Sequence, residues 1–280
     1  MDDQPQNDAR ISAIADRVLL ASVHGVSIDP ITAEQGGLDL DAAYAVAASV
    51  RRHREARGER VIGRKIGFTN RTIWPEYGVY APIWGYVYDT TVRRIADLSG
   101  PLGIGHLVEP RIEPEIILKL ASAPESGMDE QALLSCIEWI AHGFEIVQSI
   151  FPGWRFQAAD TVAAFGLHGA LLVGEPEPVT PATMTTWYEA LGDFRITLER
   201  NGTDQDTGRA GNVLNGGPLS ALRHLSELLA ISPGSPPLAA GEIISTGTLT
   251  RALPIEPGET WSTRLAGVPL EGISVRFGST

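Results

Sequence analysis

The chain has 280 residues, 43% hydrophobic and 20% charged, which is typical of a globular protein long enough to bury a sizeable core. Acids outnumber bases by 34 to 22, and the net charge of −12 disfavours nucleic acid as a partner because phosphate backbones are repelled. The single cysteine, Cys136, excludes both an intramolecular disulfide and a cysteine-cluster metal site.

The first residues, MDDQPQNDAR, are polar and acidic, unlike a signal peptide, and no apolar run reaches the ~18 residues of a membrane span. We therefore expect a cytoplasmic protein without membrane association. Residues 1–9 are expected to be a frayed tail. From Ile11 onward, apolar residues recur at the spacing of an amphipathic helix, and a second helix is expected over 40–55, before Gly58.

After residue 60 the pattern changes to short apolar runs separated by Gly and Pro turns. The runs with strand composition are RVIGRKIGF, WGYVYD, RIEPEIILKL, FEIVQSI, GALLVG, DFRITLERNG, EIISTG and GISVRFG. Two helices are expected among them, near 129–142 and near 218–230, because apolar residues recur there three or four apart. The prediction is an α+β fold with a mixed sheet system. Residues 1–60 would form an N-terminal helical cap and residues 61–280 a β-rich catalytic body.

The run RIEPEIILKL, residues 111–120, places two carboxylates beside a long apolar stretch. Pro114 argues against a helix interior, and in a strand the side chains of Arg111, Glu113 and Glu115 share one face. Two carboxylates ~7 Å apart on one strand face repel each other unless a cation lies between or over them. Arg111 is one candidate for this cation, as a structural partner, and a divalent metal ion is the other.

Glu145, in HGFEIVQSI, is a third carboxylate among apolar neighbours. As a strand, this run places Glu145 and Val147 on one face and Phe144 and Ile146 on the other. Hard cations such as Mg²⁺ prefer oxygen ligands, commonly carboxylates together with waters and substrate oxygens. Three carboxylates on short strands would make a facial oxygen site with positions open for a substrate.

Further polar residues stand in apolar or glycine-rich surroundings. Lys65, between two glycines in VIGRKIGF, either pairs with a carboxylate or binds a substrate anion or moves a proton. Asp160 and Thr161, which open DTVAAFGLHG, are candidates to hydrogen-bond a carboxylate, as is the run Ser245–Thr248. β-turns use the same residue types, so an ordinary turn remains the alternative interpretation.

Seven motifs, in their order and spacing, resemble the fumarylacetoacetate hydrolase superfamily, and within it the branch of 2-keto-4-pentenoate hydratases and 4-oxalocrotonate decarboxylases. The motifs are GRKIGFT, PRIEPEI, FEIVQSI, DTVAAFGLHGALLVG, NGGPLSALRHLSELLA, AAGEIISTGTLT and GISVRF, and they cover nearly the whole chain. The resemblance implies a mixed β-sandwich roll. It also implies a Mg²⁺ or Mn²⁺ ion held by Glu113, Glu115 and Glu145.

In such enzymes the metal chelates the C1 carboxylate and 2-oxo group of a 2-keto acid and stabilises the enolate that forms when a proton moves. The resemblance implies that Lys65 moves this proton or pairs with the substrate carboxylate. It implies substrate contacts by Thr161 and Thr248, and Arg111 and Asp160 are further candidates for such contacts. It also implies a small 2-keto acid as the substrate and a homo-oligomeric assembly.

The chain departs from the branch pattern in two places. Ile83, in APIWG, stands where the hydratases have an aspartate in a QPDFG-like turn, and AAFGLHG stands where they read ADNASSG, so that a serine is lost. His168 is a candidate for the missing proton-transfer group, because imidazole titrates near neutrality, and a packed histidine is the alternative. Trp84 and Leu167 make this side more apolar, which predicts a bulkier or less charged substrate tail.

The leading hypothesis is a metal-dependent hydratase that converts a 2-hydroxy-2,4-dienoate into a 4-hydroxy-2-keto acid in aromatic catabolism. A 4-oxalocrotonate-type decarboxylase and an acylpyruvate C–C hydrolase share the enolate chemistry; GFTNRTIW lacks the His–Glu pair of the hydrolases, which disfavours hydrolysis. The alternative of another class is a catalytically degenerate homologue that binds a keto acid or forms a complex. The retained Lys65 and the glutamates argue against that alternative, whereas Ile83 and the lost serine argue for it.

Overall fold

The computed structural model describes residues 3–125, 127–232 and 234–280. Two helices, α1 (Asp3–His24) and α2 (Leu40–Ala56), form the N-terminal part. Helix α2 begins where Asp39 accepts a hydrogen bond from the backbone of Ala42, which satisfies a free N–H of the first turn. Among the described helices, none combines the length and the apolar character that a bilayer crossing requires.

The predicted frayed tail was wrong for the part of it that the structure describes, because α1 already begins at Asp3; residues 1 and 2 lie outside the described ranges. Ile14 and Val18 bury the helix against the rest of the protein. A helix anchored by packing extends at little cost per added residue, because only its first turn is expensive to form.

The larger sheet has nine strands and begins the β-rich part of the chain. Its main order is β2-β1-β11-β5-β6-β7-β3, with β12 paired to β5 and β8 paired to β6. The pairs β1–β11 and β3–β7 are parallel and the others antiparallel, so the predicted mixed sheet is confirmed. The strand bounds are β1 (Val61–Gly67), β2 (Ile83–Tyr88), β3 (Val92–Arg94), β5 (Arg111–Leu120), β6 (Ile137–Val147), β7 (His168–Val173), β8 (Glu177–Pro178), β11 (Ile243–Ser245) and β12 (Leu253–Pro254).

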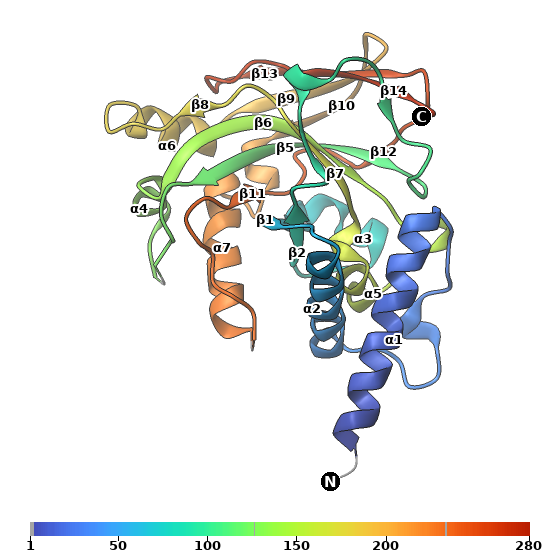
Figure 1. Ribbon diagram of the computed structural model, residues 1–280. Helices are drawn as coiled ribbons and strands as arrows, with labels where there is room; N and C mark the ends of the chain where they lie inside the picture. Colours follow the sequence, from blue (N-terminus) through green and yellow to red (C-terminus); the bar gives the residue numbers. More distant parts are fainter. Residues whose placement is uncertain (1–2, 126, 233) are drawn as a thin grey trace.

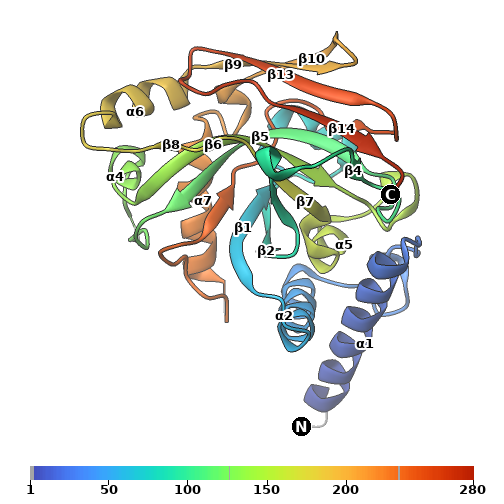
Figure 2. The same cartoon turned by 45° about the horizontal axis from the view of Figure 1, so that its top comes forward.

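The smaller sheet has five strands in the order β10-β9-β13-β14-β4 and lies over β5 and β6 (Figure 1). Ile112 and Phe144 of the larger sheet pack there against Trp261 and Phe277 of the smaller one, which joins the two layers through one apolar core. Figure 2 shows how strongly the larger sheet curves from β5 and β6 round to β1 and β2. The bounds are β4 (Leu102–Gly103), β9 (Arg195–Arg200), β10 (Thr203–Arg209), β13 (Thr260–Ala266) and β14 (Ser274–Gly278).

Helices α1 and α2, and the long helix that follows β10 and its 3₁₀ turn, lie on the other side of β5 and β6 (Figure 1). The predicted helix near 218–230 is confirmed as α7 (Pro218–Ile231), which buries Leu219, Leu222, Leu225 and Leu229 in the core. Helix α6 (Met184–Gly192) was not predicted. The short helices are α3 (Trp74–Tyr77), α4 (Glu130–Leu134) and α5 (Ala158–Ala163), and the 3₁₀ turns cover Ile31–Ala33, Arg71–Ile73, Ile95–Asp97, Pro152–Trp154, Phe165–Leu167 and Ala210–Asn212.

The predicted helix near 129–142 was wrong beyond residue 134. Helix α4 ends at Leu134, and from Ile137 the chain is strand β6. Leu133 and Ile137 have helical spacing, but β6 pairs with β5 along the whole of the latter and also with β7. Backbone pairing on both sides over this length outweighs a local preference.

Two sets of polar contacts join parts of the chain that are distant in sequence. His142 is buried on β6; its Nδ1 donates to the Glu115 carbonyl and its Nε2 accepts from Thr263 Oγ1 of β13, at 2.9 Å each. In the N-terminal part, the backbone and hydroxyl of Thr32 donate to the carboxylate of Asp160 on α5, at 2.9 and 2.6 Å.

The division of the chain at residue 60 into a helical cap and a catalytic body stays a prediction.

Candidate active site

Three carboxylates meet on the concave face of strands β5 and β6. Glu113 lies directly opposite Glu145 in the ladder, and Glu115 lies opposite Gly143, one step further along. One oxygen from each glutamate lies within 4.8 Å of the others. Ile112, next to Glu113 on β5, packs on the opposite face into the core, as the alternation predicted.

Glu115 is fully buried and only one of its oxygens is held by the protein. Oε2 accepts hydrogen bonds from Ser245 Oγ at 2.5 Å and from the Gly247 backbone at 2.8 Å. Oε1 has no hydrogen-bond partner among the described residues. The run Ser245–Thr248 therefore does bind a carboxylate, as predicted, and that carboxylate belongs to the protein itself.

Glu145 is also fully buried and is arranged in the same way. Its Oε1 lies 2.8 Å from His168 Nδ1, and its Oε2 lies 3.1 Å from Lys65 Nζ. Within the described part of the chain, Oε2 accepts no well-aligned hydrogen bond. Each of these two glutamates thus has one oxygen that is held by hydrogen bonds to the protein and one oxygen without a hydrogen bond. We call the groups that hold the first oxygen the clamp.

Lys65 comes to the carboxylates from β1, and its Nζ donates to the Gly166 carbonyl at 2.9 Å. Gly166 has a φ of +64°, and a Cβ at this position would lie 3.1 Å from Lys65 Cδ and 3.3 Å from Ile83 Cδ1. A glycine is therefore needed here for the backbone to come this close to Lys65. Ile83 lies beside the apolar stem of the lysine.

The charges of this cluster are strongly coupled. Burial raises the pKa of Glu113 to about 7 and that of Glu115 well above its usual value, and the neighbouring carboxylates add to both effects. Burial alone would also raise the pKa of Glu145, but Lys65 and His168 hold it below its usual value. Burial lowers the pKa of Lys65, yet the three carboxylates outweigh this and leave it raised.

The donor set fits a divalent cation. Three buried or half-buried carboxylates face one ammonium group, which leaves excess negative charge in a place where unpaired charge is costly. Two carboxylate oxygens, Glu115 Oε1 and Glu145 Oε2, are buried without a hydrogen bond. Oxygen ligands with net negative charge are what Mg²⁺ and Mn²⁺ prefer.

A cavity opens in front of Lys65 and Glu113. Its wall is apolar and aromatic, formed mainly by Phe68, Ile73, Tyr77, Val147, Trp154 and Leu167. Thr248 also lines the cavity, and its hydroxyl donates to the Thr250 carbonyl at 3.0 Å. The predicted contact Thr248 is thus brought to the site.

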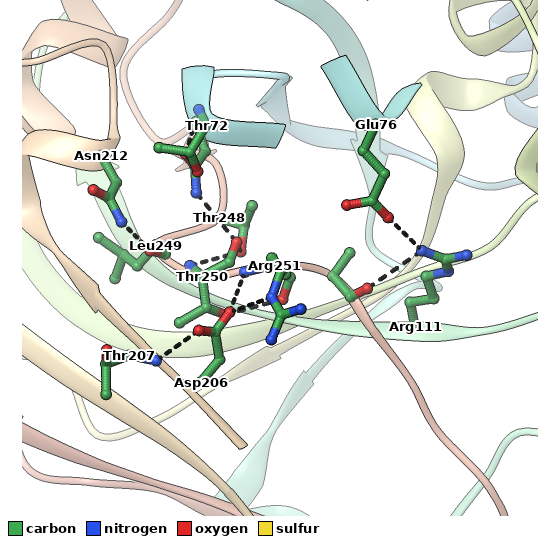
Figure 3. A network of polar contacts seen from close by, with 12 residues as sticks. Thr72, Glu76, Arg111, Asp206, Thr207, Asn212, Thr248, Leu249, Thr250 and Arg251 are labelled. Atoms are coloured by element: carbon green, nitrogen blue, oxygen red, sulfur yellow. Dashed lines mark hydrogen bonds and ion pairs between the residues drawn. The ribbon is translucent and has the colours of Figure 1, made fainter. Parts of the chain in front are cut away.

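Arg111 lies behind this wall. Its guanidinium carbon is 4.3 Å from the ring centre of Trp154, and Nη1 donates to the Tyr77 hydroxyl at 2.7 Å. Nη1 also lies 3.5 Å from Glu76 Oε1 (Figure 3). The structure records no ion pair between Arg111 and Glu113 or Glu115, so the alternative in which Arg111 neutralises the acid pair is not observed.

The segment that carries Thr248 is fixed from outside the cavity (Figure 3). Asp206 Oδ2 accepts hydrogen bonds from the backbone N and from Nε of Arg251, both at 3.0 Å. Asn212 Nδ2 donates to the Leu249 carbonyl at 2.9 Å. The wall at Thr248 is therefore held in place without support from a ligand.

Asp160 and Thr161 are not brought to the cavity. The carboxylate of Asp160 accepts from Thr32 and from the Gln157 backbone, and so caps α5 and holds the N-terminal part. The Thr161 hydroxyl donates to the Ala158 carbonyl at 2.7 Å. Asp160 and Thr161 are both fully buried, and we leave them out of the proposed site.

His168 is fully enclosed behind Glu145. Its Nδ1 faces Glu145 Oε1 and its Nε2 lies 2.8 Å from Thr91 Oγ1. It is not among the residues that line the cavity. The predicted proton-transfer role would need access to the substrate, and the structure places the imidazole one layer away from it.

The aromatic wall and Thr91 were not predicted from the sequence. Tyr77 and Trp154 stand in WPEYG and FPGW, where proline and glycine indicated only turns. The density of aromatic residues in these two turns was the available signal, because exposed turns rarely carry so many large rings. No local signal pointed to Thr91, whose contact with His168 joins residues 77 positions apart.

A search against family models found no match. The chain is 30% identical over 245 residues to the 2-keto-4-pentenoate hydratase of Paraburkholderia xenovorans, with 87% of each chain covered. It is 28% identical over 243 residues to the 2-hydroxyhexa-2,4-dienoate hydratase of Comamonas testosteroni, covering 86% of this chain and 88% of the relative.

Among solved structures, the 4-oxalocrotonate decarboxylase of Pseudomonas putida G7, complexed with magnesium and adipate, superposes with a TM-score of 0.84 at 26% identity. That comparison covers 96% of this chain and 97% of the decarboxylase. The fumarylpyruvate hydrolase of Pseudomonas aeruginosa, in complex with Mn²⁺ and pyruvate, has a TM-score of 0.57 at 13% identity and shares the fold.

Proposed function

This chain belongs to the 2-keto-4-pentenoate hydratase and 4-oxalocrotonate decarboxylase branch of the fumarylacetoacetate hydrolase superfamily, and we propose Glu113, Glu115 and Glu145 as the metal ligands of its active site. The protein is a divalent-metal-dependent lyase that acts on a small 2-keto or 2-hydroxydienoic acid, and its main activity is hydration. The single observation that carries the site assignment is the convergence of three carboxylates and Lys65, of which Glu113 and Lys65 line an apolar cavity.

The carboxylates would hold Mg²⁺ or Mn²⁺ through oxygens that the protein leaves without hydrogen bonds. When bound, the ion supplies a Lewis acid that stabilises negative charge on the 2-oxo oxygen of the substrate. Glu115 and Glu145 are preorganised for this task, since Ser245, Gly247 and His168 fix the other oxygen of each. Glu113, the half-buried member, lines the cavity and faces the substrate side.

Lys65 would hold and move the proton. An ammonium group has three donors. One is donated to the Gly166 carbonyl, and a second lies towards Glu145 Oε2 in an ion pair at 3.1 Å that is not a well-aligned hydrogen bond. The third is available to the cavity that Lys65 lines. Hydration of a 2-hydroxy-2,4-dienoate transfers its hydroxyl proton to C5 and adds the elements of water across C3 and C4, which gives a 4-hydroxy-2-keto acid. A lysine beside the 2-oxygen is suited to the first transfer.

The apolar wall supports hydration of a monocarboxylate over decarboxylation of a dicarboxylate. Among the described residues that line the cavity, Lys65 is the only cation, and it lies at the carboxylate end. Arg111, behind the aromatic wall, is already covered by Trp154 and paired with Tyr77 and Glu76. Decarboxylation stays the second candidate because the decarboxylase of Pseudomonas putida G7 matches this fold over almost its entire length.

We further propose a cytoplasmic homo-oligomer. Exposed apolar side chains at the end of α1, among them Leu20 and Val23, and Ile231 at the end of α7 support burial against other copies. Size-exclusion chromatography with light scattering would measure the assembly, and a strictly monomeric protein would contradict this proposal.

Turnover of three substrates with Mg²⁺ or Mn²⁺ tests the activity: 2-hydroxypenta-2,4-dienoate, 4-oxalocrotonate and an acylpyruvate. We expect the first to yield 4-hydroxy-2-oxopentanoate by addition of water. Release of CO₂ from 4-oxalocrotonate at a higher kcat/KM would make decarboxylation the main activity. Failure to convert any of the three with either metal would overturn the proposed function.

A further inference from the structure

The imidazole of His168 is shut off from the cavity by the residue it contacts. The side chain is 1% exposed and stands at the start of β7, where its backbone pairs with Val147 of β6. Both ring nitrogens have partners at 2.8 Å, Glu145 Oε1 on one side and Thr91 Oγ1 on the other. No ring nitrogen is left over for a substrate.

The position of one proton follows from this geometry. An ionised carboxylate only accepts hydrogen bonds, so Nδ1 must carry the hydrogen that it shares with Glu145. The Thr91 hydroxyl, which also lies 3.0 Å from the Tyr88 carbonyl, completes the contact at Nε2 and fixes the plane of the ring. The imidazole is therefore a fixed donor to Glu145.

The consequence for Glu145 is that its two oxygens are no longer equivalent. Oε1 is occupied by His168, so only Oε2 is available at the centre of the carboxylate cluster, where it lies 3.1 Å from Lys65 Nζ. Ser245 and Gly247 do the same to Glu115 by occupying its Oε2. The two clamps are built from different strands, β7 and the end of β11, but have the same effect on neighbouring ligands.

We propose that His168 is a positioning residue, which orients Glu145 through Nδ1 so that a single oxygen faces the metal, and that it does not exchange protons with the substrate. The inference rests on the proposed metal site and extends it to the layer behind the ligands. Outer partners of this kind typically change metal affinity ~10- to 100-fold when removed. Thr91 supports the same task by holding the ring.

Two substitutions at His168 separate positioning from proton transfer. In His168→Asn the amide nitrogen takes the place of Nδ1 and keeps the donor to Glu145, whereas His168→Ala removes it. Calorimetric titration with Mg²⁺ and Mn²⁺ should show affinity ~10- to 100-fold weaker for His168→Ala and largely restored for His168→Asn. The pH profile of kcat for His168→Asn should keep the shape of the parent profile.

His142→Asn is the matched control, because it removes a buried imidazole from the same sheet while the clamp on the Glu115 carboxylate stays intact. It should lower thermal stability without changing metal affinity. If His168→Ala does not fold, Thr91→Val replaces it as the test. This variant keeps the imidazole but removes the hydroxyl that fixes the orientation of the ring, and it should weaken metal binding by a smaller factor than His168→Ala.

Unchanged metal affinity in His168→Ala, or in Thr91→Val if the alanine variant does not fold, would overturn the positioning role. So would a His168→Asn variant that binds metal normally but loses the near-neutral limb of the pH profile, since this would identify a proton carrier. A parent protein that binds neither Mg²⁺ nor Mn²⁺ would instead overturn the proposed metal site, and the role of His168 with it.

Discussion

Glu113 and Glu145 stand directly opposite each other across the antiparallel pair of β5 and β6. Opposed residues in such a ladder have side chains ~5 Å apart, a distance at which two buried like charges repel strongly. The protein keeps both acids at this place and adds Glu115 beside them. This arrangement of acids is unfavourable by itself and would become favourable with a divalent cation bound to the carboxylates.

Replacing Glu113 by Gln should therefore have opposite effects on stability with and without metal. Without metal, the variant should be more stable than the parent, because one of three repelling acids is gone. With saturating Mg²⁺, it should be less stable, because a ligand is lost. Thermal melts in EDTA and in Mg²⁺ measure both. Glu76→Gln, an exposed change outside the cavity, is the control; equal shifts in both buffers for Glu113→Gln would contradict the assignment.

Metal binding should release protons in slightly acidic solution. The pKa of Glu113 is about 7 in the folded protein against a usual value of 4.5. Without metal, the contribution of this group to the stability of the folded protein is therefore lost as pH rises from 4.5 to about 7. A cation needs the ionised form, and its affinity should thus rise from pH 5.5 to pH 8. Calorimetry in two buffers of different ionisation enthalpy should detect proton release near pH 6; pH-independent affinity would refute the expectation.

Lys65→Met should lower kcat by about 10²- to 10⁴-fold, the usual loss for a proton-transfer group. Metal affinity should remain or increase slightly, since the substitution removes a positive charge 3.1 Å from Glu145 Oε2. Steady-state kinetics and calorimetry on the same preparation give both values. Lys119→Met, at the far end of β5, controls for the loss of a lysine from the sheet, and a fully active Lys65→Met variant would remove the lysine from the mechanism.

Trp154→Ala should reduce the preference for substrates with an apolar tail. Loss of the indole takes away part of the cavity wall, and burial of a side chain of this size contributes about 1.5 kcal/mol or more to tail binding, roughly tenfold in KM. The unsubstituted 2-hydroxypenta-2,4-dienoate is the internal control, because it has no tail to lose contact. The same rise in KM for both substrates would show that Trp154 supports the site as a whole.

His142→Asn should make stability less sensitive to acid. Burial lowers the pKa of His142 from 6.5 to about 4, so the unfolded chain takes up a proton here while the folded protein does not. The parent should lose up to about 3 kcal/mol from this group as pH falls from 6.5 to 4, and the variant should not. Denaturant titrations at pH 7 and pH 4.5 compare the two proteins, and parallel losses would disprove this role.

The sequence predicted the carboxylate cluster because strand geometry is local. Alternation alone puts Glu113 and Glu115 on one face and Ile112 on the other, and the structure has this arrangement. It could not predict which residues hold these acids in place. Glu115 is bonded to Ser245, 130 positions later, and no local pattern specifies such a pair.

Two expectations failed for the same reason. Asp160 was expected near the substrate, but its partner is Thr32, 128 positions away in the N-terminal part. Leu133 and Ile137 have helical spacing, yet a ladder with β5 turns the second of them into the start of a strand. In both cases a contact between segments distant in sequence determines the local structure, and local sequence patterns do not predict such contacts.

The hydrogen bonds between Thr32 and Asp160 set a limit on how this protein can be shortened or split. A chain trimmed to begin after the first two helices would leave the Asp160 carboxylate buried without these donors, six positions before Gly166, whose carbonyl holds Lys65. Damage at the N-terminal end would thus reach the proposed catalytic lysine through six residues of chain. Anyone who designs minimal or circularly permuted versions should keep Thr32 and Asp160 in one folded piece.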